Sequence, residues 1–280
     1  MFTKAAVLTA LASAALATFA VATPAQAGTA ATTALPTANM EAVLKAAQID
    51  PRRADDTLTP GAHDSVLLVE QALQAKGLLA SQYVDGYFGS TTITAYSQFQ
   101  KSLGYTGIDA SGLPGKTSLE TLGEGRYTVT NPVSAGSQVT YHSKTLNTRT
   151  KAMLVAAEGI YGSQVTLTQG SYNPGGVDAS AGTHDGGGAM DISVSGMSSA
   201  NRTKLLTALR KVGFAAWLRT PAQGFDAYHI HAMAVSDPDL SSGAQHQTGD
   251  YYLGMNGLAG RGADDGPQVT KVTWEEYQRG

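Results

Sequence analysis

The sequence contains no cysteine among its 280 residues. This absence excludes a disulfide framework and any metal site built on thiolates. A metal ion in this chain must therefore be held by histidine and carboxylate side chains. Basic residues are also few, because 19 Lys and Arg stand against 22 Asp and Glu for a formal net charge of −3. Without a basic tract to neutralise a row of phosphates, we expect no nucleic-acid partner.

Long apolar runs are absent after the first 27 residues. Residues 1–27 place Lys4 before a stretch rich in Ala, Leu and Val and end in Ala25-Gln26-Ala27, the small-x-small pattern that signal peptidase cleaves. A retained membrane anchor is the alternative, but the many alanines are weakly apolar and Pro24 ends the run. We expect cleavage after about Ala27, a secreted protein of the cell wall, and no membrane association once the signal is removed.

The next part of the chain is predicted to be helical. Residues 28–61 form a leader or linker, rich in Ala and Thr, with a short helix from Met40. A stronger helix is predicted over 64–79, and two glycine-bearing turns at 85–92 and 111–118 are each followed by Ser/Thr caps and a further helix. This pattern predicts a compact three-helix arrangement over residues 62–122.

One of these turns carries a longer motif, D-G-x-F-G-x-x-T-x-x-A-x-x-x-F-Q. It resembles the peptidoglycan-binding domain of bacterial wall hydrolases, which implies that residues 62–122 bind peptidoglycan. We expect Phe88, Phe99 and Leu122 to be core residues, and exposed Tyr83 and Tyr87 to contact the ligand. The motif residues are Asp85, Gly86, Phe88, Gly89, Thr92, Ala95, Phe99 and Gln100.

Gly, Pro and Ser then mark a linker over 123–139, and a second domain is expected over 140–262, before a polar tail at 263–280. Its helices are predicted apart from several short strands, which is typical of an α+β domain with an antiparallel sheet. The predicted helices are 146–162 and 198–213, and the predicted strands are 164–171, 189–196, 214–220 and 228–235.

Three of the six histidines lie on or beside these strands. His184 is separated from Asp191 by a segment with three consecutive glycines, which predicts a tight bend or a close approach to the backbone. In His229-Ile230-His231 the two imidazoles share one face of a strand. A divalent metal held by His184, Asp191 and one of this pair would keep a fourth position for water, as catalytic zinc sites do.

The order of these residues matches H-x-x-G-x-A-x-D followed by H-x-H. It resembles the D-alanyl-D-alanine metallopeptidases and their wider group with lysostaphin-type and Hedgehog-type domains. The resemblance implies that His184, Asp191 and His231 bind Zn²⁺, and that His229 orients water or stabilises the transition state. Where an acidic general base is common in that group, this chain has Tyr228, and the nearest acid is Asp226.

A shifted register is the alternative interpretation of this motif. With His229 as the ligand, Asp226 would stand three residues before it, and His231 would become the helper. The strand upstream of the first motif carries no arginine for a substrate carboxylate. Gln169 and Ser171 stand there instead, which favours an endopeptidase.

Together these patterns predict a secreted, monomeric zinc peptidase anchored to peptidoglycan, its polymeric substrate. It would act as a carboxypeptidase or endopeptidase on stem peptides or cross-bridges. The alternative is a non-catalytic wall-binding protein with a degenerate peptidase-like domain, for which Tyr228 is the main argument. An amidase that cuts between sugar and peptide is a third possibility, since it can use similar ligands.

Overall fold

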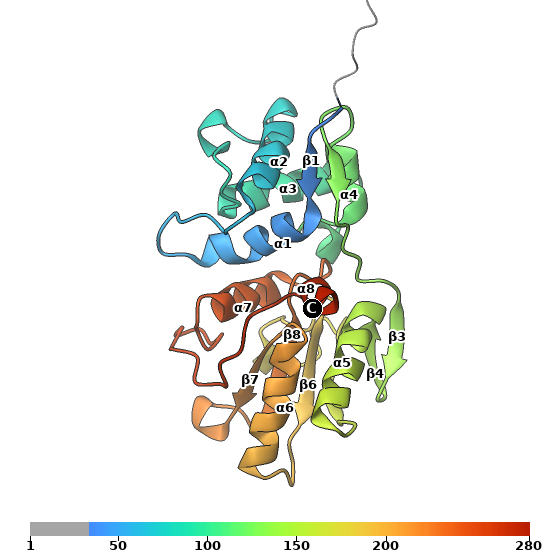
Figure 1. The fold of residues 1–280 in the computed structure, drawn as a ribbon, viewed down its shortest axis with the longest axis vertical. Coiled ribbons are helices and arrows are strands. Elements are labelled where there is room, and N and C mark those ends of the chain that lie inside the picture. The colour runs from blue at the N-terminus through green and yellow to red at the C-terminus, as the bar shows by residue number, and fades with distance from the viewer. Residues whose placement is uncertain (1–33) are drawn as a thin grey trace, which may run out of the picture. The chain divides into compact units, whose positions relative to one another are not determined.

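A computed structural model of the chain describes residues 34–280. The signal peptide expected at residues 1–27 lies outside this range. Across the described residues, no helix combines the length and apolar character needed to cross a membrane. Helices are mixed with antiparallel sheets (Figure 1), so the expected α+β class is confirmed.

The N-terminal part of the described chain contains four α-helices. They are α1 (Met40–Ile49), α2 (His63–Ala75), α3 (Ser90–Ser102) and α4 (Lys116–Leu122). Phe88, Phe99 and Leu122 are each at most 1% exposed, so the prediction that they belong to the core is confirmed. A short parallel ladder joins β1 (Thr37–Asn39) to β2 (Thr128–Thr130).

Helix α1 is more deeply buried than its place in a predicted linker suggested. The Asn39 side chain caps it by accepting from the Glu41 amide at 3.1 Å. Most of its apolar residues, including Leu44, are buried where α1 packs against α2 and α7 (Ser242–Tyr252). Just beyond it, Arg52 donates twice to Asp250 at 2.9 and 3.0 Å. The structure therefore gives this segment a packing role that its composition did not indicate.

The C-terminal part is built on a four-stranded antiparallel sheet in the order β5-β6-β8-β7. A separate hairpin, β3 (Gln138–Tyr141) and β4 (Lys144–Asn147), precedes α5 (Thr148–Tyr161), and α6 (Ser199–Lys211) links β6 to β7. The predicted strands and both predicted helices are present. The four strands are β5 (Leu167–Gln169), β6 (Ala189–Ser193), β7 (Phe214–Arg219) and β8 (His229–Ala234).

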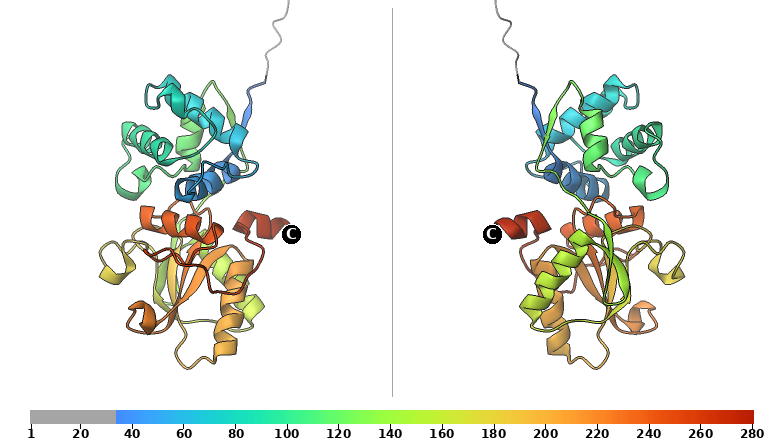
Figure 2. Two further views of the ribbon diagram at one scale, coloured as in Figure 1. Left: turned by 90° about the vertical axis from the view of Figure 1, so that its left-hand side faces the viewer. Right: turned by 90° about the vertical axis from the view of Figure 1, so that its right-hand side faces the viewer.

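The two faces of this sheet have different partners. Ile192 and Ile230 point into a core that α5 and α6 close on one side of the sheet (Figure 2). On the other face, Ala189, Met233 and Trp217 belong to a core shared with α7. This second face also carries the polar residues of the candidate site, because side chains alternate along each strand.

The C-terminal segment, expected as a polar tail, ends in helix α8 (Trp274–Arg279). Glu275 accepts from the buried Arg149 of α5 at 2.8 Å, and Glu276 accepts from Lys45 of α1 at 2.6 Å. Asp264 is paired with the fully buried Arg210 at 2.8 Å. These contacts hold residues 263–280 against the rest of the described chain.

Candidate metal site

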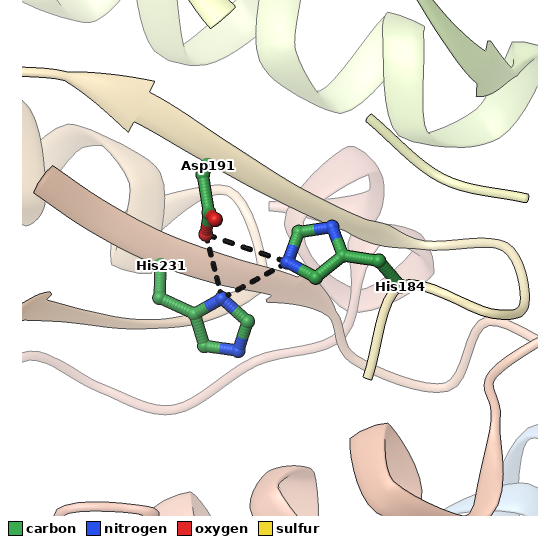
Figure 3. A group of neighbouring side chains, drawn as sticks. All are labelled: His184, Asp191 and His231. Carbon is green, nitrogen blue, oxygen red and sulfur yellow. Dashed lines mark hydrogen bonds and ion pairs between the residues drawn. The ribbon is translucent and has the colours of Figure 1, made fainter. Parts of the chain in front are cut away.

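Three side chains converge on the second face of the sheet. Asp191 of β6 lies directly opposite His231 of β8 in the antiparallel ladder, so their side chains project to the same side. His184 reaches the same point from the glycine loop before β6 (Figure 3). The residues predicted as metal ligands are thus brought together by two strands and one loop.

The donor atoms form a compact triangle. His184 Nε2 lies 3.4 Å from Asp191 Oδ1 and 3.4 Å from His231 Nδ1, and His231 Nδ1 lies 2.7 Å from Asp191 Oδ1. Ligands about 2.0 Å from a tetrahedral zinc ion are separated by about 3.3 Å. The triangle therefore has nearly the dimensions that such an ion requires, and the described residues form a group able to hold a metal ion.

Both histidines are oriented by acceptors on their outer nitrogens. His184 Nδ1 donates to the Gly170 carbonyl at 2.8 Å, and His231 Nε2 donates to Gln247 Oε1 at 3.1 Å. The neutral rings therefore present lone pairs at His184 Nε2 and His231 Nδ1. Two lone pairs and the Asp191 carboxylate would repel one another, and a bound cation turns this repulsion into attraction.

Burial and hydrogen bonding set the charges of the cluster. His184 is fully buried, His231 is 6% exposed, and Asp191 is half-buried. Burial lowers the pKa of His231 to about 4. Burial also acts to raise the pKa of Asp191, but the two adjoining histidine rings hold it well below its usual range. At neutral pH Asp191 is thus a carboxylate and His231 is neutral, as metal binding requires of these two residues.

The glycine loop is packed closely on both sides. Gly187 donates its amide to the Asp239 carbonyl at 2.7 Å, and the Gly186 carbonyl accepts from the Tyr172 amide at 2.8 Å. A Cβ atom at Gly187 would lie 2.6 Å from the Tyr172 hydroxyl. The predicted close approach to this backbone is confirmed, and the approaching groups come from the protein itself.

His229 lies in the next row of the same face, opposite Ser193 and Arg219. It is half-buried, and its Nδ1 donates to the Ala227 carbonyl at 3.0 Å, which leaves Nε2 free to accept a proton. Because His231 pairs with Asp191, the shifted register that would make His229 the ligand does not occur. Asp226 is exposed and makes no hydrogen bond or ion pair with residues 34–280.

One of the neighbours of the site, Gln247, was not predicted. Gln247 comes from α7, and no motif marked it, because its contact depends on how α7 packs against the sheet. Gln169 faces Asp191 across the ladder, and its Nε2 has no partner among the described residues. Ser171, two residues after Gln169, donates its hydroxyl to the Ala189 carbonyl at 2.7 Å.

The turn of the motif at residues 85–100 is held by a buried carboxylate that the sequence did not single out. Glu70 Oε2 accepts from the amides of Asp85 and Gly86 at 3.0 and 2.8 Å, and Oε1 accepts from Thr92 at 3.0 Å. Tyr83 is exposed as expected, but Tyr87 is half-buried and donates its hydroxyl to the Asp50 carbonyl. Tyr83 is therefore the better candidate for ligand contact.

A cleft of about 410 Å³ lies away from the three donors. Its lining includes Ile108, Lys116, Ser134 and Asp239. Neither His184, Asp191 nor His231 lines it, so the donor group stands apart from this hollow.

Comparison with known protein families, with curated proteins and with solved structures finds no match for this chain. The functional argument therefore depends on the geometry of the described residues.

Proposed function

We propose that this protein is a secreted zinc peptidase that hydrolyses peptide bonds of the bacterial cell wall. The observation that carries the proposal is the donor triangle of His184, Asp191 and His231, with both rings oriented by acceptors on their outer nitrogens. Two imidazoles and one carboxylate are the donor set of several catalytic zinc sites, which retain an open position for water.

Zinc bound there would supply Lewis-acid chemistry, lowering the pKa of water to about 7 and polarising a peptide carbonyl. His229 supports the reaction as a proton carrier because Nε2 is its free acceptor. It would take a proton as the water oxygen bonds to the carbonyl carbon. It would then return this proton to the amine as the C–N bond breaks. Asp226, exposed on the turn before β8, is the alternative base.

The N-terminal helices would hold the enzyme on its insoluble substrate. Support comes from the motif at residues 85–100 and from the buried Glu70 that fixes its first turn. Exposed Tyr83 stands beside this turn. Tethering raises the local concentration of wall peptides without new contacts at the reaction centre. We propose a monomer, with these helices as the three-helix peptidoglycan-binding bundle.

A second candidate function is a wall-binding protein that holds metal without turnover. Tyr228, where an acid would be expected, favours it. This side chain is 46% exposed and lies under the Arg202 guanidinium, whose carbon is 4.7 Å from the ring centroid. Tyrosine does not replace a carboxylate as a general base, so this role would fall to His229 or Asp226.

The test is elemental analysis of the mature protein, residues 28–280, combined with muropeptide digestion and mass spectrometry of the products. We expect about one zinc per chain, which His231→Ala and the nearly isosteric Asp191→Asn lose. His246→Ala, an exposed histidine on α7, is the matched control and should retain the metal.

New peptide termini would support the peptidase, and release of intact peptide from the sugar would indicate an amidase. Zinc binding without any cleavage would favour the non-catalytic alternative. A wild-type protein that takes up no zinc would contradict the metal site itself.

A further inference from the structure

A buried arginine next to the metal ligands lacks a full set of partners. Arg219 ends β7 and is 1% exposed. Its Nη1 donates to the Asn256 carbonyl at 2.8 Å, and its guanidinium carbon lies 5.0 Å from the Trp217 ring centroid. Within residues 34–280 no acceptor faces its buried Nη2. An unpaired donor on a buried cation is unfavourable, so this group lacks an acceptor that a ligand could supply.

Arg210, a buried arginine with a structural role in the same domain, provides a comparison for Arg219. It is equally buried, and its guanidinium is paired with the Asp264 carboxylate and with the carbonyls of Ala216 and Pro267, at 2.7 to 2.9 Å. The incomplete pairing of Arg219 therefore distinguishes it from a structural arginine.

The strand register places Arg219 beside the reaction centre. Trp217 lies opposite His231, and Arg219 lies opposite His229, so all of them project to the face of the metal ligands. Two residues along an antiparallel strand correspond to about 7 Å. Burial lowers the pKa of Arg219 to about 10, with the charge of Asp191 acting in the opposite direction. The guanidinium is thus cationic at neutral pH.

A second unpaired donor flanks the ligands on the other outer strand. Gln169 of β5 lies opposite Asp191 and is 8% exposed, and its Nε2 has no partner in the described part of the chain. Along the sheet, the metal ligands of β6 and β8 therefore have one free amide donor on the β5 side and one free cationic donor on the β7 side.

We propose that Arg219 binds the free C-terminal carboxylate of the substrate and that Gln169, on the other side of the metal ligands, donates to a carbonyl of the preceding peptide chain, which makes this site a carboxypeptidase. The inference depends on the proposed zinc peptidase function. In a C-terminal residue, the carboxylate lies about 4 Å from the scissile carbonyl. An arginine one row from the metal ligands, with a hydrogen bond of about 3 Å, spans the remaining distance. A peptide cleaved at an internal bond has no carboxylate next to Arg219, so Nη2 would stay unpaired.

This assignment reverses the preference for an endopeptidase that the sequence suggested. That preference depended on the absence of an arginine upstream of His184. The cation instead comes from β7, a strand that follows both ligands of the first motif in the chain and adjoins β8 only in the folded sheet.

The experiment compares two peptides of identical sequence, one with a free C-terminal carboxylate and one amidated. The zinc-loaded wild type should prefer the acid by about 10- to 100-fold in kcat/KM. Arg219→Gln should lose this preference, mainly through a higher KM for the acid. Arg219→Lys, which retains the charge, should keep part of the preference. Gln169→Leu should lower kcat/KM for the acid and for the amide by the same factor.

Arg210→Gln is the matched control, because it removes an equally buried guanidinium from the same domain. It should lower stability and leave the acid preference of the folded enzyme intact. Equal hydrolysis of acid and amide by wild type, or an unchanged preference in zinc-replete Arg219→Gln, would overturn the inference while leaving the peptidase function in place.

Absence of hydrolysis in a zinc-loaded wild type would instead reject the proposed function. Calorimetric binding of the two peptides would then still decide the role of Arg219. Tighter binding of the acid that Arg219→Gln abolishes would support it, and equal binding of acid and amide would reject it.

Discussion

Replacement of Gly187 by alanine tests whether the packing of the glycine loop positions His184. The new Cβ atom would lie 2.6 Å from the Tyr172 hydroxyl, 2.7 Å from Asp239 Cβ and 2.8 Å from Asn147 Nδ2, where ordinary contacts begin at 3.4 Å. Neighbours on three sides must therefore each move by most of an ångström. Because Gly187 does not have a positive φ, the cost is steric rather than conformational.

Overpacking of this kind lowers the free energy of unfolding by about 1–3 kcal/mol. Replacing glycine by alanine also restricts the unfolded chain, which offsets about 0.5–1 kcal/mol of this loss. We expect Gly187→Ala to lose about 1–2 kcal/mol of stability, which lowers Tm by about 2–4 °C per kcal/mol in a chain of this size. Displacement of His184 should also weaken zinc binding at least about tenfold. Calorimetric melting and chelator competition measure the two effects.

Gly159→Ala is the matched control, since a Cβ at this exposed position of α5 meets no atom within 4 Å. It should stabilise the helix by about 0.5–1 kcal/mol and leave zinc affinity unchanged. Adding Tyr172→Phe to Gly187→Ala removes one of the three close contacts and should restore part of the lost stability. A Gly187→Ala protein with wild-type Tm and wild-type zinc affinity would refute the reasoning.

Three further predictions address other parts of the chain. Burial raises the pKa of Glu70 to about 7 from 4.5, so its contribution to stability is complete below about pH 4.5 and falls by about 3 kcal/mol as the pH rises through 7. Glu70→Gln, which stays neutral, should remove this dependence in urea unfolding between pH 4.5 and 8, and identical slopes would contradict it. Leu44→Ala should cost about 2–5 kcal/mol in the same assay because Leu44 is fully buried in α1, whereas Leu35→Ala, at a 42% exposed position, should cost under about 0.5 kcal/mol. Equal stability costs for the two substitutions would indicate that this segment is a detachable leader. Gln247→Leu removes the acceptor of His231 Nε2 and should weaken zinc binding about 10- to 100-fold in chelator competition, while His246→Ala beside it should not. Equal affinities would show that Gln247 does not orient the ligand.

Local patterns predicted much of the fold. Alternation of polar and apolar residues in His229-Ile230-His231 identified a strand whose histidines share a face, and β8 has this arrangement. The glycines before β6 predicted a close approach of other groups, which Tyr172 and Asp239 provide. Such signals are readable because they depend on the geometry of neighbouring residues in one element.

Contacts between segments that are distant in the sequence were harder to predict. Residues 28–61 were interpreted as a leader or linker with a short helix, and residues 263–280 as a tail, because their composition resembles exposed chain. Their helices α1 and α8 are nevertheless fixed by pairs such as Lys45 with Glu276, which are 231 residues apart in the sequence. No short-range pattern contains this information.

For the candidate site, the sequence by itself determined the chemistry available. It provided a cysteine-free donor set, with His184, Asp191 and the His229/His231 pair at spacings that suit a loop and two strands. Only the tertiary structure decided which of the paired histidines joins the cluster, because this follows from the register that sets His231 opposite Asp191. It also brought Gln247 and Arg219 to the site, since a helix and a neighbouring strand contribute side chains only once the chain has packed.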